Sequence, residues 1–357
     1  MAKSFDALFP EVVDFPNLYQ AWRQAAKGKR GQPAAATFEL NLGDELVRLQ
    51  RDMADETWRP GPYHSFAILD PKPRLVSAAP FRDRVVHHAL CQVIEPLFEN
   101  TFIGDSYANR RGKGTHAALD RAQAFMRGHR YVLQCDIRQF FPSVDHAILE
   151  AVLFRKIADP AVQRLMALII DSGGGIHDEA FRMVFFPGDD LLAAARPRGL
   201  PIGNLTSQFW ANVYLNELDQ FVKRRLRCRA YLRYVDDFLL FSDDKPTLWA
   251  WKAAVTEFLA GLRLALHERS STVYPVAAGV PFLGFRLYPG HRLLKRRNGV
   301  NFQRRLARYH RAYGRGEMGF DDLRQRVQGW LAHVSAADTW GLRRSLLSRP
   351  LPLRQLT

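Results

Sequence analysis

The chain has 357 residues, of which 51 are Lys or Arg and 36 are Asp or Glu, so its formal net charge is +15 at pH 7. Hydrophobic residues make up 47% and charged residues 24%, a globular composition that excludes wholesale disorder and a collagen-like chain. The length suits two or three packed units. The excess of positive charge favours a polyanionic partner, because clustered Lys and Arg release counterions from phosphates.

Membrane insertion, export and disulfide bonding are not expected. No apolar run is long enough to span a bilayer. The first residues, Met1-Ala2-Lys3-Ser4-Phe5-Asp6, lack the apolar core of a signal peptide. The three cysteines are widely spaced and fit neither a disulfide framework nor a zinc site; they are Cys91, Cys135 and Cys228. We therefore expect a cytoplasmic protein with no membrane association.

The first part of the chain is predicted to be mainly helical. Residues 1–60 form a helical lead, with a helix from about Asp44 to Thr57. Prolines on both sides confine Tyr63–Leu69 to an extended segment. The apolar residues of Phe81–Phe98 then predict a buried helix.

A short apolar strand that ends in a carboxylate is predicted at Tyr131–Asp136. Pro142 ends the extended stretch that follows, and Ser143 or Asp145 is predicted to cap a helix over His146–Lys156.

Residues 171–198 predict an irregular, hairpin-like insertion between two helices. The loop Gly199–Gln208 then leads into a helix that continues to Val222, with Thr206 or Ser207 as its cap. A glycine-rich loop that enters a helix suits close approach of a sugar or a phosphate.

The C-terminal pattern is helical from Phe302 on, with breaks at Gly314, Gly316 and Gly319. Strands and helices alternate along the chain without the regular rhythm of βαβ units. We therefore expect an α+β fold with a helical C-terminal module.

Four Asp-Asp pairs occur, so a bare pair carries little information, and its usual place is a turn or a helix cap. The pair Asp236-Asp237 differs because it lies inside the apolar and aromatic segment Tyr231–Phe241. That segment predicts a tight hairpin that lifts two carboxylates above a buried sheet. Two anions beside apolar strands cost free energy unless a cation neutralises them.

Asp136, at the end of the earlier strand, is the third candidate ligand. Each aspartate also has a plain structural interpretation, as a turn residue. Mg²⁺ takes one or two protein carboxylates alongside substrate phosphates, and three aspartates on adjacent strands could hold two ions about 3.5–4 Å apart. Asp136 and Asp236 are 100 residues apart, so their meeting depends on the fold.

Taken together, the segments around Asp136, Gly199–Gln208 and Asp236 resemble motifs A, B and C of reverse transcriptases, and Tyr234–Asp237 matches the Tyr-x-Asp-Asp box of that family. Asp70–Arg74 resembles the fingers segment that grips the triphosphate, and Pro281–Phe285 resembles the primer grip. The resemblance implies a right-hand polymerase with fingers, a palm (an antiparallel sheet flanked by helices) and a helical thumb. The expected units are an N-terminal helical lead at 1–60, fingers at 61–130, a palm at 131–287 that contains the insertion, and a basic thumb at 288–357.

The resemblance also implies individual roles. Asp136 and Asp236 would bridge two Mg²⁺ ions, for which Mn²⁺ could substitute, with Asp237 assisting and Ile137 completing the metal site. The primer 3′-hydroxyl would then attack the α-phosphate of a dNTP. The dNTP-binding candidates are Lys72, Arg74, Phe141, Ile202, Gly203 and Gln208, and the primer-grip candidates are Phe282, Leu283 and Gly284.

Two of these residues bear on substrate selection. Phe141 stands where the family places a steric gate against a ribose 2′-hydroxyl, although core packing would also explain it. Ile202 stands where relatives place a Gln, and an aliphatic side chain supplies shape but no hydrogen bond. We therefore expect weaker discrimination between right and wrong substrates, unless Ile202 merely packs the loop.

The form of motif B, Ile202–Gln208, resembles the reverse transcriptases of diversity-generating retroelements, as do Pro80–His88 and Gly329–His333. Those bacterial or phage-encoded enzymes copy a template RNA with frequent errors opposite adenine. The resemblance implies template RNA, nascent cDNA, dNTPs, a small basic oligomeric accessory variability protein and a structured retroelement RNA as partners. Without a maturase or endonuclease extension after the thumb, a full group II intron protein is not expected.

Three alternatives stay open: an antiphage-defence or retron-like reverse transcriptase, a non-catalytic RNA-binding protein with a polymerase fold, and an RNA replicase. Phe141 as a gate disfavours the replicase.

Basic stretches predict a path for the template and primer. Residues 291–316 carry nine Lys or Arg and no acidic residue, interleaved with aromatic residues. A second basic stretch runs over 221–233. The named contact candidates are Arg110, Arg111 and Lys113 in the fingers and Arg304, Arg305 and Arg308 in the thumb.

Overall fold

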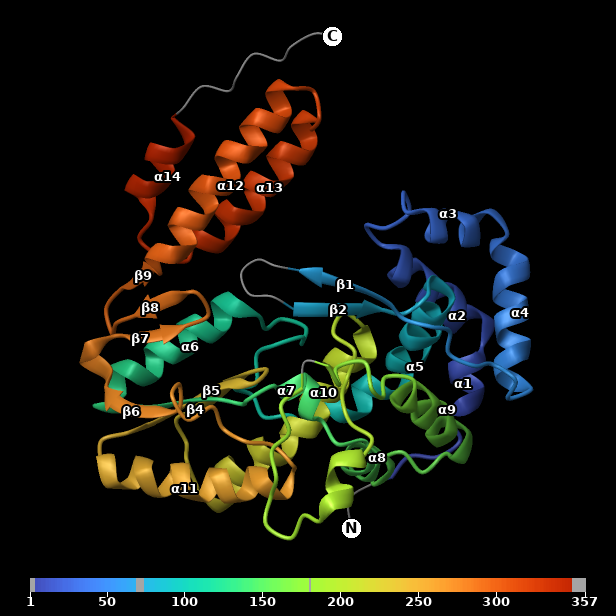
Figure 1. Ribbon diagram of the computed structural model, residues 1–357, viewed down its shortest axis with the longest axis horizontal. Helices are drawn as coiled ribbons and strands as arrows, with labels where there is room; N and C mark the ends of the chain where they lie inside the picture. The colour runs from blue at the N-terminus through green and yellow to red at the C-terminus, as the bar shows by residue number, and fades with distance from the viewer. Residues whose placement is uncertain (1–3, 69–73, 180, 349–357) are drawn as a thin grey trace.

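The computed structural model describes residues 4–68, 74–179 and 181–348, shown as coloured ribbon in Figure 1. The N-terminal part is a helical cluster built on the long helix α5 (Phe81–Glu99). Helices α1 (Phe9–Val13), α2 (Phe15–Ala26) and α3 (Pro33–Leu40) contact α5, and α4 (Leu42–Ala54) packs on these three. The helices predicted at Phe81–Phe98 and Asp44–Thr57 are thus confirmed, with small shifts of their ends.

Two strands follow α4 in a small antiparallel ribbon, β1 (His64–Ile68) and β2 (Arg74–Ala78). The extended segment predicted at Tyr63–Leu69 contains β1. Helix α6 (Thr115–Gly128) then leads into the central sheet.

The central sheet has the strand order β4-β5-β3-β6, and its paired strands are antiparallel. Its strands are β3 (Tyr131–Asp136), β4 (Tyr231–Tyr234), β5 (Asp237–Ser242) and β6 (Thr272–Pro275). Strand β3 has the predicted bounds, and β4 and β5 form the predicted hairpin. The α+β class predicted from the sequence is therefore confirmed.

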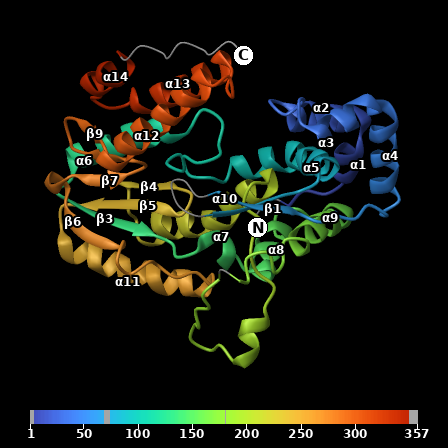
Figure 2. The same cartoon turned by 45° about the horizontal axis from the view of Figure 1, so that its top comes forward.

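Both faces of this sheet are covered, which explains why its strands are almost continuously apolar. On β3, Leu133 and Cys135 join the cluster that contains helices α10 (Leu205–Gln220) and α11 (Lys245–Gly261). The alternate residue Val132 joins a second cluster with α6. Figure 2 shows the sheet between α11 on one side and α6 on the other.

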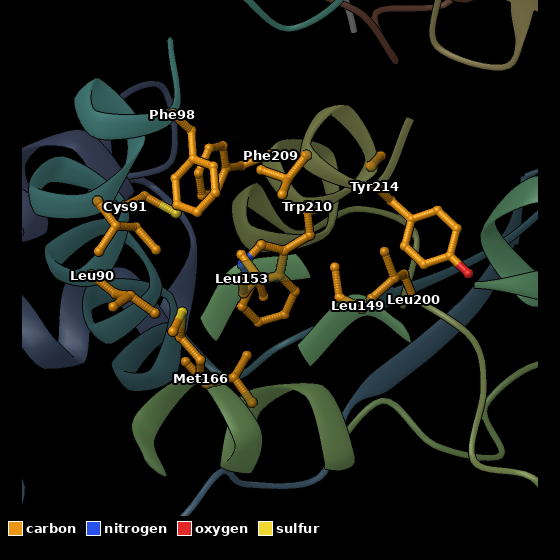
Figure 3. Packing of buried hydrophobic residues seen from close by; sticks show 14 of the residues in the cluster. Leu90, Cys91, Phe98, Leu149, Leu153, Met166, Leu200, Phe209, Trp210 and Tyr214 are labelled. Carbon is orange, nitrogen blue, oxygen red and sulfur yellow. The ribbon is translucent and has the colours of Figure 1, made fainter. Parts of the chain in front are cut away.

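Helix α10 is fixed by a core shared with helices α5, α8 (His146–Phe154) and α9 (Pro160–Asp171). Phe98 of α5 packs edge-on against Phe209 of α10, with ring centres 5.5 Å apart (Figure 3). Trp210 and Leu200, also drawn in Figure 3, belong to the same cluster. This core therefore fixes both the helix and the loop that precedes it.

The C-terminal part begins with a three-stranded antiparallel sheet, β7 (Val280–Phe282), β8 (Phe285–Leu287) and β9 (Arg292–Leu294). Helices α12 (Arg296–Gly314), α13 (Phe320–Val334) and α14 (Trp340–Leu347) follow and project away from the central sheet (Figure 1). They have a core of their own, in which Phe302 stacks on Trp330 at 3.8 Å between ring centres. The helical breaks predicted at Gly314, Gly316 and Gly319 are confirmed.

The insertion at 171–198 differs from the prediction. Its described residues form turns and a short 3₁₀ helix at Leu191–Ala195, with no hairpin strands. Asp190 caps that helix and Asp189 accepts hydrogen bonds from Arg196 and Arg263. Side-chain bonds, one of them from the distant Arg263, therefore hold this segment in place of strand pairing. Among the described helices, none is both long and apolar enough to cross a bilayer.

Candidate active site

Asp136, Asp236 and Asp237 meet at one edge of the central sheet. Asp136 ends β3 and Asp237 begins β5, and the two residues lie directly opposite each other in the antiparallel ladder. The backbone N–H of Ile137 donates to the carbonyl oxygen of Asp236 at 3.3 Å. All three aspartates are half-buried. The fold thus brings together backbone positions that are 100 residues apart in sequence and places an aspartate at each of them.

The turn that carries Asp236 is strained. Tyr234 pairs with Asp237, so Val235 and Asp236 are the two residues of the hairpin loop. Val235 has a φ of 55°, in the left-handed region that a β-branched residue rarely adopts. Such backbone strain is typical of functional sites, where the surrounding structure must hold it.

A segment that the sequence did not single out supports Asp136. The His267 N–H donates to the Asp136 carbonyl oxygen at 2.8 Å, and Ser270 Oγ lies 3.3 Å from Asp136 Oδ2 as a donor. Both residues precede β6, 131 or more positions along the chain from Asp136. Only the sheet pairing of β3 with β6 brings them there, so no local sequence pattern could have found them.

The donor set at this edge suits a hard divalent cation. The ligands offered are carboxylate oxygens, which Mg²⁺ prefers, and Mg²⁺ needs only one or two of them besides substrate phosphates. Ile137 could contribute only its backbone carbonyl, because its hydrocarbon side chain has no ligand atom; the whole residue is 2% exposed. Within residues 4–68, 74–179 and 181–348, no three His, Cys, Asp or Glu side chains form a ready-made metal cage. Two of these carboxylates would meet the requirement of a Mg²⁺ ion whose other ligands are substrate phosphates.

The loop Gly199–Asn204 is bonded to both β2 and the segment after β3. Leu200 N–H donates to the Phe141 carbonyl oxygen at 2.9 Å, and Ser77 N–H donates to the Ile202 carbonyl oxygen at 2.9 Å. Gly203 has a φ of 116°, and a Cβ there would lie 2.8 Å from Val76 Cγ1. Only glycine fits this position. Ile202, the residue before it, and Gln208, in α10, are half-buried.

The cap of α10 differs from the prediction. Thr206 and Ser207 are buried inside the first turn, and Asn204 is the N-cap residue. The Asn204 side chain does not bond to the helix; it accepts from Ala79 N–H and donates to the Ser77 carbonyl oxygen. A cross-link to β2 has therefore taken the place of local capping.

The two phenylalanines after β3 divide between core and surface. Both belong to the short helix α7 (Phe140–Ser143). Phe140 is fully buried, whereas Phe141 is half-buried and packs edge-on against it at 5.4 Å between ring centres. Asp145 caps α8 by accepting from Ile148 N–H, so of the two predicted caps Asp145 is the correct one.

Residues 69–287, more than half of the chain, match the family described as "Reverse transcriptase (RNA-dependent DNA polymerase)". The chain belongs to this family. Protein YkfC of Escherichia coli (strain K12) is 26% identical over 302 residues, which are 73% of this chain and 74% of that protein. The group II intron-encoded protein LtrA of Lactococcus lactis subsp. cremoris is 24% identical over 220 residues, 60% of this chain but only 34% of LtrA.

Among solved structures, an apo telomerase from Candida Tropicalis, truncated from its C-terminal domain, has a TM-score of 0.49 at 11% identity, over 69% of this chain and 59% of that one.

The hairpin predicted as the primer grip of this reverse transcriptase is a two-residue turn between Phe282 and Phe285. Leu283 and Gly284 have φ values of 45° and 90°. Phe282 is buried in the palm, so only Leu283 and the turn backbone are accessible. The Gly284 carbonyl oxygen accepts from Lys295 N–H at 3.0 Å and from Asn298 Nδ2 at 3.1 Å.

The basic residues predicted to contact template and primer differ in their exposure. Arg111, Arg304 and Arg308 are exposed, Arg304 and Arg308 lying one turn apart on α12, and Arg305 is half-buried. Lys113 is half-buried, and its Nζ donates to the Gly104 carbonyl oxygen. Arg74 begins β2 and is exposed, whereas Lys72 lies outside the described residues.

Two predictions for basic residues are corrected. The Arg110 side chain is 6% exposed and bonds to Glu99 and to the carbonyl oxygens of Ile103 and Ser106, so it holds its own loop instead of facing a nucleic acid. Arg233, counted in the second basic stretch, is fully buried against Asp219. Burial beside a carboxylate satisfied these two guanidinium groups, which charge counting along the sequence cannot detect.

The other Asp-Asp pairs are structural, as their sequence setting indicates. Asp190 and Asp244 cap helices, and Asp321 and Asp322 lie in the first turn of α13. The three free cysteines are buried.

Proposed function

We propose that this RNA-directed DNA polymerase carries out nucleotidyl transfer at the site formed by Asp136, Asp236 and Asp237. The observation that carries the proposal is the pairing of Asp136 with Asp237 across β3 and β5, with Asp236 in the adjoining turn. The template is RNA, the substrates are dNTPs and the product is cDNA.

The three carboxylates would hold two Mg²⁺ ions, which supply charge neutralisation and a more acidic primer hydroxyl. The chain itself contributes by placing the substrate. The backbone bonds from Leu200 to Phe141 and from Ser77 to Ile202 fix the loop of motif B against β2. Substrate held between these segments reacts faster because its orientation is fixed before the chemical step.

The half-buried ring of Phe141 supports a role as a gate against ribose, because Phe140 already fills the core position beneath it. A smaller residue at 141 is expected to admit rNTPs. Arg74, exposed at the start of β2, is a candidate for the triphosphate.

The test is primer extension on a defined RNA template with dNTPs and Mg²⁺. Asp136→Asn is expected to lower the rate by at least about 10²- to 10³-fold, the usual loss when one charge-stabilising group is removed. Asp322→Asn is the matched control, since it changes an aspartate of another Asp-Asp pair, in the first turn of α13, and is expected to leave the rate unchanged. Equal rates for both variants and the wild type would contradict the proposal.

We further propose that synthesis is error-prone and serves a diversity-generating retroelement, together with an accessory variability protein and a structured RNA, in the cytoplasm of a bacterium. Support comes from Ile202, whose side chain can offer motif B only an apolar surface. Deep sequencing of the cDNA is expected to show errors concentrated opposite adenine, and Ile202→Gln is expected to reduce them. An unchanged error spectrum in Ile202→Gln would reject the role of Ile202.

A second candidate is synthesis on an intron-type RNA, which the similarity to an intron-encoded protein favours. The chain covers only 34% of that relative, so the activity of the whole relative does not carry over. One assay distinguishes the two candidates: cDNA synthesis on RNA transcribed from the DNA beside the gene, with and without the product of any small basic protein gene found there. Dependence on that protein supports diversification, and an accurate, partner-independent product supports the intron type.

A further inference from the structure

A fully buried polar network lies directly beneath the Tyr234–Asp237 turn. Arg233 of β4 and Asp219 of α10 are both 0% exposed and form a forked ion pair. Arg233 Nε donates to Asp219 Oδ1 at 2.8 Å, and Nη2 donates to Oδ2 at 2.7 Å. Tyr231 Oη donates to the same Oδ1 at 2.7 Å.

The remaining terminal nitrogen of Arg233 reaches the turn. Nη1 donates to the Val235 carbonyl oxygen at 3.1 Å and to Asn212 Oδ1 at 3.2 Å. Val235 is the residue with the left-handed φ of 55°, and its carbonyl belongs to the peptide bond that leads into Asp236. One guanidinium therefore ties the hairpin loop to helix α10.

Stability alone does not explain this pair. Removing two charges from water costs several kcal/mol per ion, and apolar replacements of buried ion pairs are often neutral or stabilising. What an apolar pair cannot supply is the hydrogen bond to the Val235 carbonyl. A Val residue in the left-handed region costs about 1–2 kcal/mol, so the turn needs a fixed partner to keep its shape.

The edge of β4 that does not pair with β5 is also hydrogen-bonded. Arg233 N–H donates to the Asp105 carbonyl oxygen, and Tyr107 N–H donates to the Arg233 carbonyl oxygen, both at 3.0 Å. Asn212 Nδ2 donates to the Ala108 carbonyl oxygen at 2.9 Å. Because loop, strand and helix all converge on Arg233, the guanidinium has a single well-defined position.

We propose that Asp219 and Arg233 are a positioning pair that holds the Tyr234–Asp237 turn, and with it the carboxylates of Asp236 and Asp237, in the geometry that catalysis requires. This inference rests on the proposed catalytic role of those carboxylates. Burial alone would lower the pKa of Arg233, but the charge of Asp219 raises it above its usual value, so the pair stays ionised.

The test uses the full chain and two variants. Asp219→Asn with Arg233→Met removes both charges together, keeps an acceptor for Tyr231 and leaves no unpaired buried ion. Arg233→Lys keeps the charge but lacks the fork, since a single ammonium cannot serve Asp219 and the Val235 carbonyl in the same way. Thermal unfolding, kcat, the KM for primer–template and the Mg²⁺ concentration for half-maximal activity are measured for each.

For the double variant we expect a folded protein with a lower unfolding temperature, because the Val235 carbonyl and Asn212 Oδ1 lose their donor. We also expect an unchanged KM for primer–template, a higher Mg²⁺ requirement and a kcat lower by about 10²-fold, the loss typical of a misplacement of about 1 Å. For Arg233→Lys we expect the same changes in smaller degree. A folded double variant with wild-type kcat and Mg²⁺ requirement would overturn the inference. If the double variant does not fold, Arg233→Lys decides on the same measurements.

Asp159→Asn is the matched control. Asp159 is another buried aspartate, and it accepts hydrogen bonds from four backbone N–H groups at the starts of α1 and α9, away from the turn. It is expected to lower the unfolding temperature without changing the Mg²⁺ requirement. If Asp159→Asn raised the Mg²⁺ requirement as much as the double variant does, lost stability would explain the rise in both, and the inference would be overturned. Loss of all activity in the wild type would instead contradict the proposed function.

Discussion

Two hairpin turns of this reverse transcriptase each contain a non-glycine residue in the left-handed region, but different parts of the molecule hold them in place. The turn at Tyr234–Asp237 has no glycine, places Val235 in the left-handed region and is held from within the palm by Arg233. The turn at Phe282–Phe285 has Gly284 and is held from outside, by Lys295 and Asn298 at the base of the thumb. The first is therefore fixed to the palm, whereas the second is fixed to the thumb.

The comparison explains where each kind of fastening is useful. Carboxylates that position metal ions must keep one geometry, and a buried ion pair has one low-energy arrangement. The turn predicted to contact the primer is bonded to α12, the helix that carries the basic residues predicted to contact the duplex, so the two would move together. Changes at the primer-grip turn should therefore affect nucleic-acid binding, and changes at the palm turn should affect the chemical step.

Among changes at the primer-grip turn, the largest effect is expected for Gly284→Val. A Cβ at 284 would lie 2.8 Å from Asn298 Nδ2 and 3.5 Å from His333 Nε2, and the φ of 90° is unfavourable for any side chain. Backbone strain of about 1–2 kcal/mol and overpacking of about 1–3 kcal/mol should push the thumb away from the turn. We expect the KM for primer–template to rise at least about tenfold, with the KM for dNTP changed much less. Equal changes in the two KM values would contradict the prediction that this turn affects nucleic-acid binding and not the chemical step.

A smaller effect is expected for Asn298→Ala. This change removes one hydrogen bond to the Gly284 carbonyl oxygen, worth about 1 kcal/mol, while Lys295 N–H keeps its own bond to that oxygen. The KM for primer–template should rise about fivefold, and the Mg²⁺ requirement should stay constant. Gln303→Ala, an exposed position on the same helix, is the control. A shift in the Mg²⁺ requirement would show that the thumb also reaches the palm turn.

A paired substitution measures the strain in the two turns. Asn adopts the left-handed region more readily than Val or Leu, so Val235→Asn should raise the free energy of unfolding by about 1 kcal/mol. Leu283→Asn should gain less, because Leu is not β-branched and its neighbour Gly284 already relieves the turn. Denaturant unfolding of both variants checks this order. A larger gain in the free energy of unfolding for Leu283→Asn would contradict this order. It would mean that the Val235 backbone, held by Arg233, is not the more strained of the two.

Much of this architecture follows from the sequence because its signals are local. The strand Tyr131–Asp136, the helix at Phe81 and the hairpin at Tyr231–Phe241 each carry an apolar pattern and a clear boundary residue. The resemblance of three motifs then identified Asp136, Asp236 and Asp237 as a set. The predicted boundaries of fingers, palm and thumb stay predictions.

What the sequence did not reveal depends on contacts between distant segments. Ser270 reaches Asp136, and Asn204 bonds to β2, only because strands and loops far apart in the chain meet. Charge counting placed Arg110 and Arg233 on a nucleic-acid path, yet each is turned inward by a carboxylate, Glu99 or Asp219. Net charge reports how many guanidinium groups exist, not which of them face solvent.

The smallest expected effect is a pH dependence confined to the primer-grip turn. His333 of α13 packs on Phe285, with ring centres 4.9 Å apart, and burial lowers its pKa, as does the nearby His116. A histidine whose pKa is lowered in the folded protein stabilises less as the pH falls below about 6.5, because the unfolded chain takes up the proton first. At pH 6 the cost is at most about 0.8 kcal/mol, and solvent screening reduces it.

We therefore expect the KM for primer–template to rise about twofold between pH 8 and pH 6, beyond any change in kcat. In His333→Phe, whose ring can still pack on Phe285 but cannot ionise, this rise should disappear. Substitution of His129, half-buried at the end of α6 and away from the turn, should leave it in place. The palm turn should show no matching change over this range, since Arg233 holds its charge and its pKa is raised further by Asp219. A Mg²⁺ requirement that followed the same pH curve would show that both turns respond to His333, and the division between a palm-held and a thumb-held turn would fail.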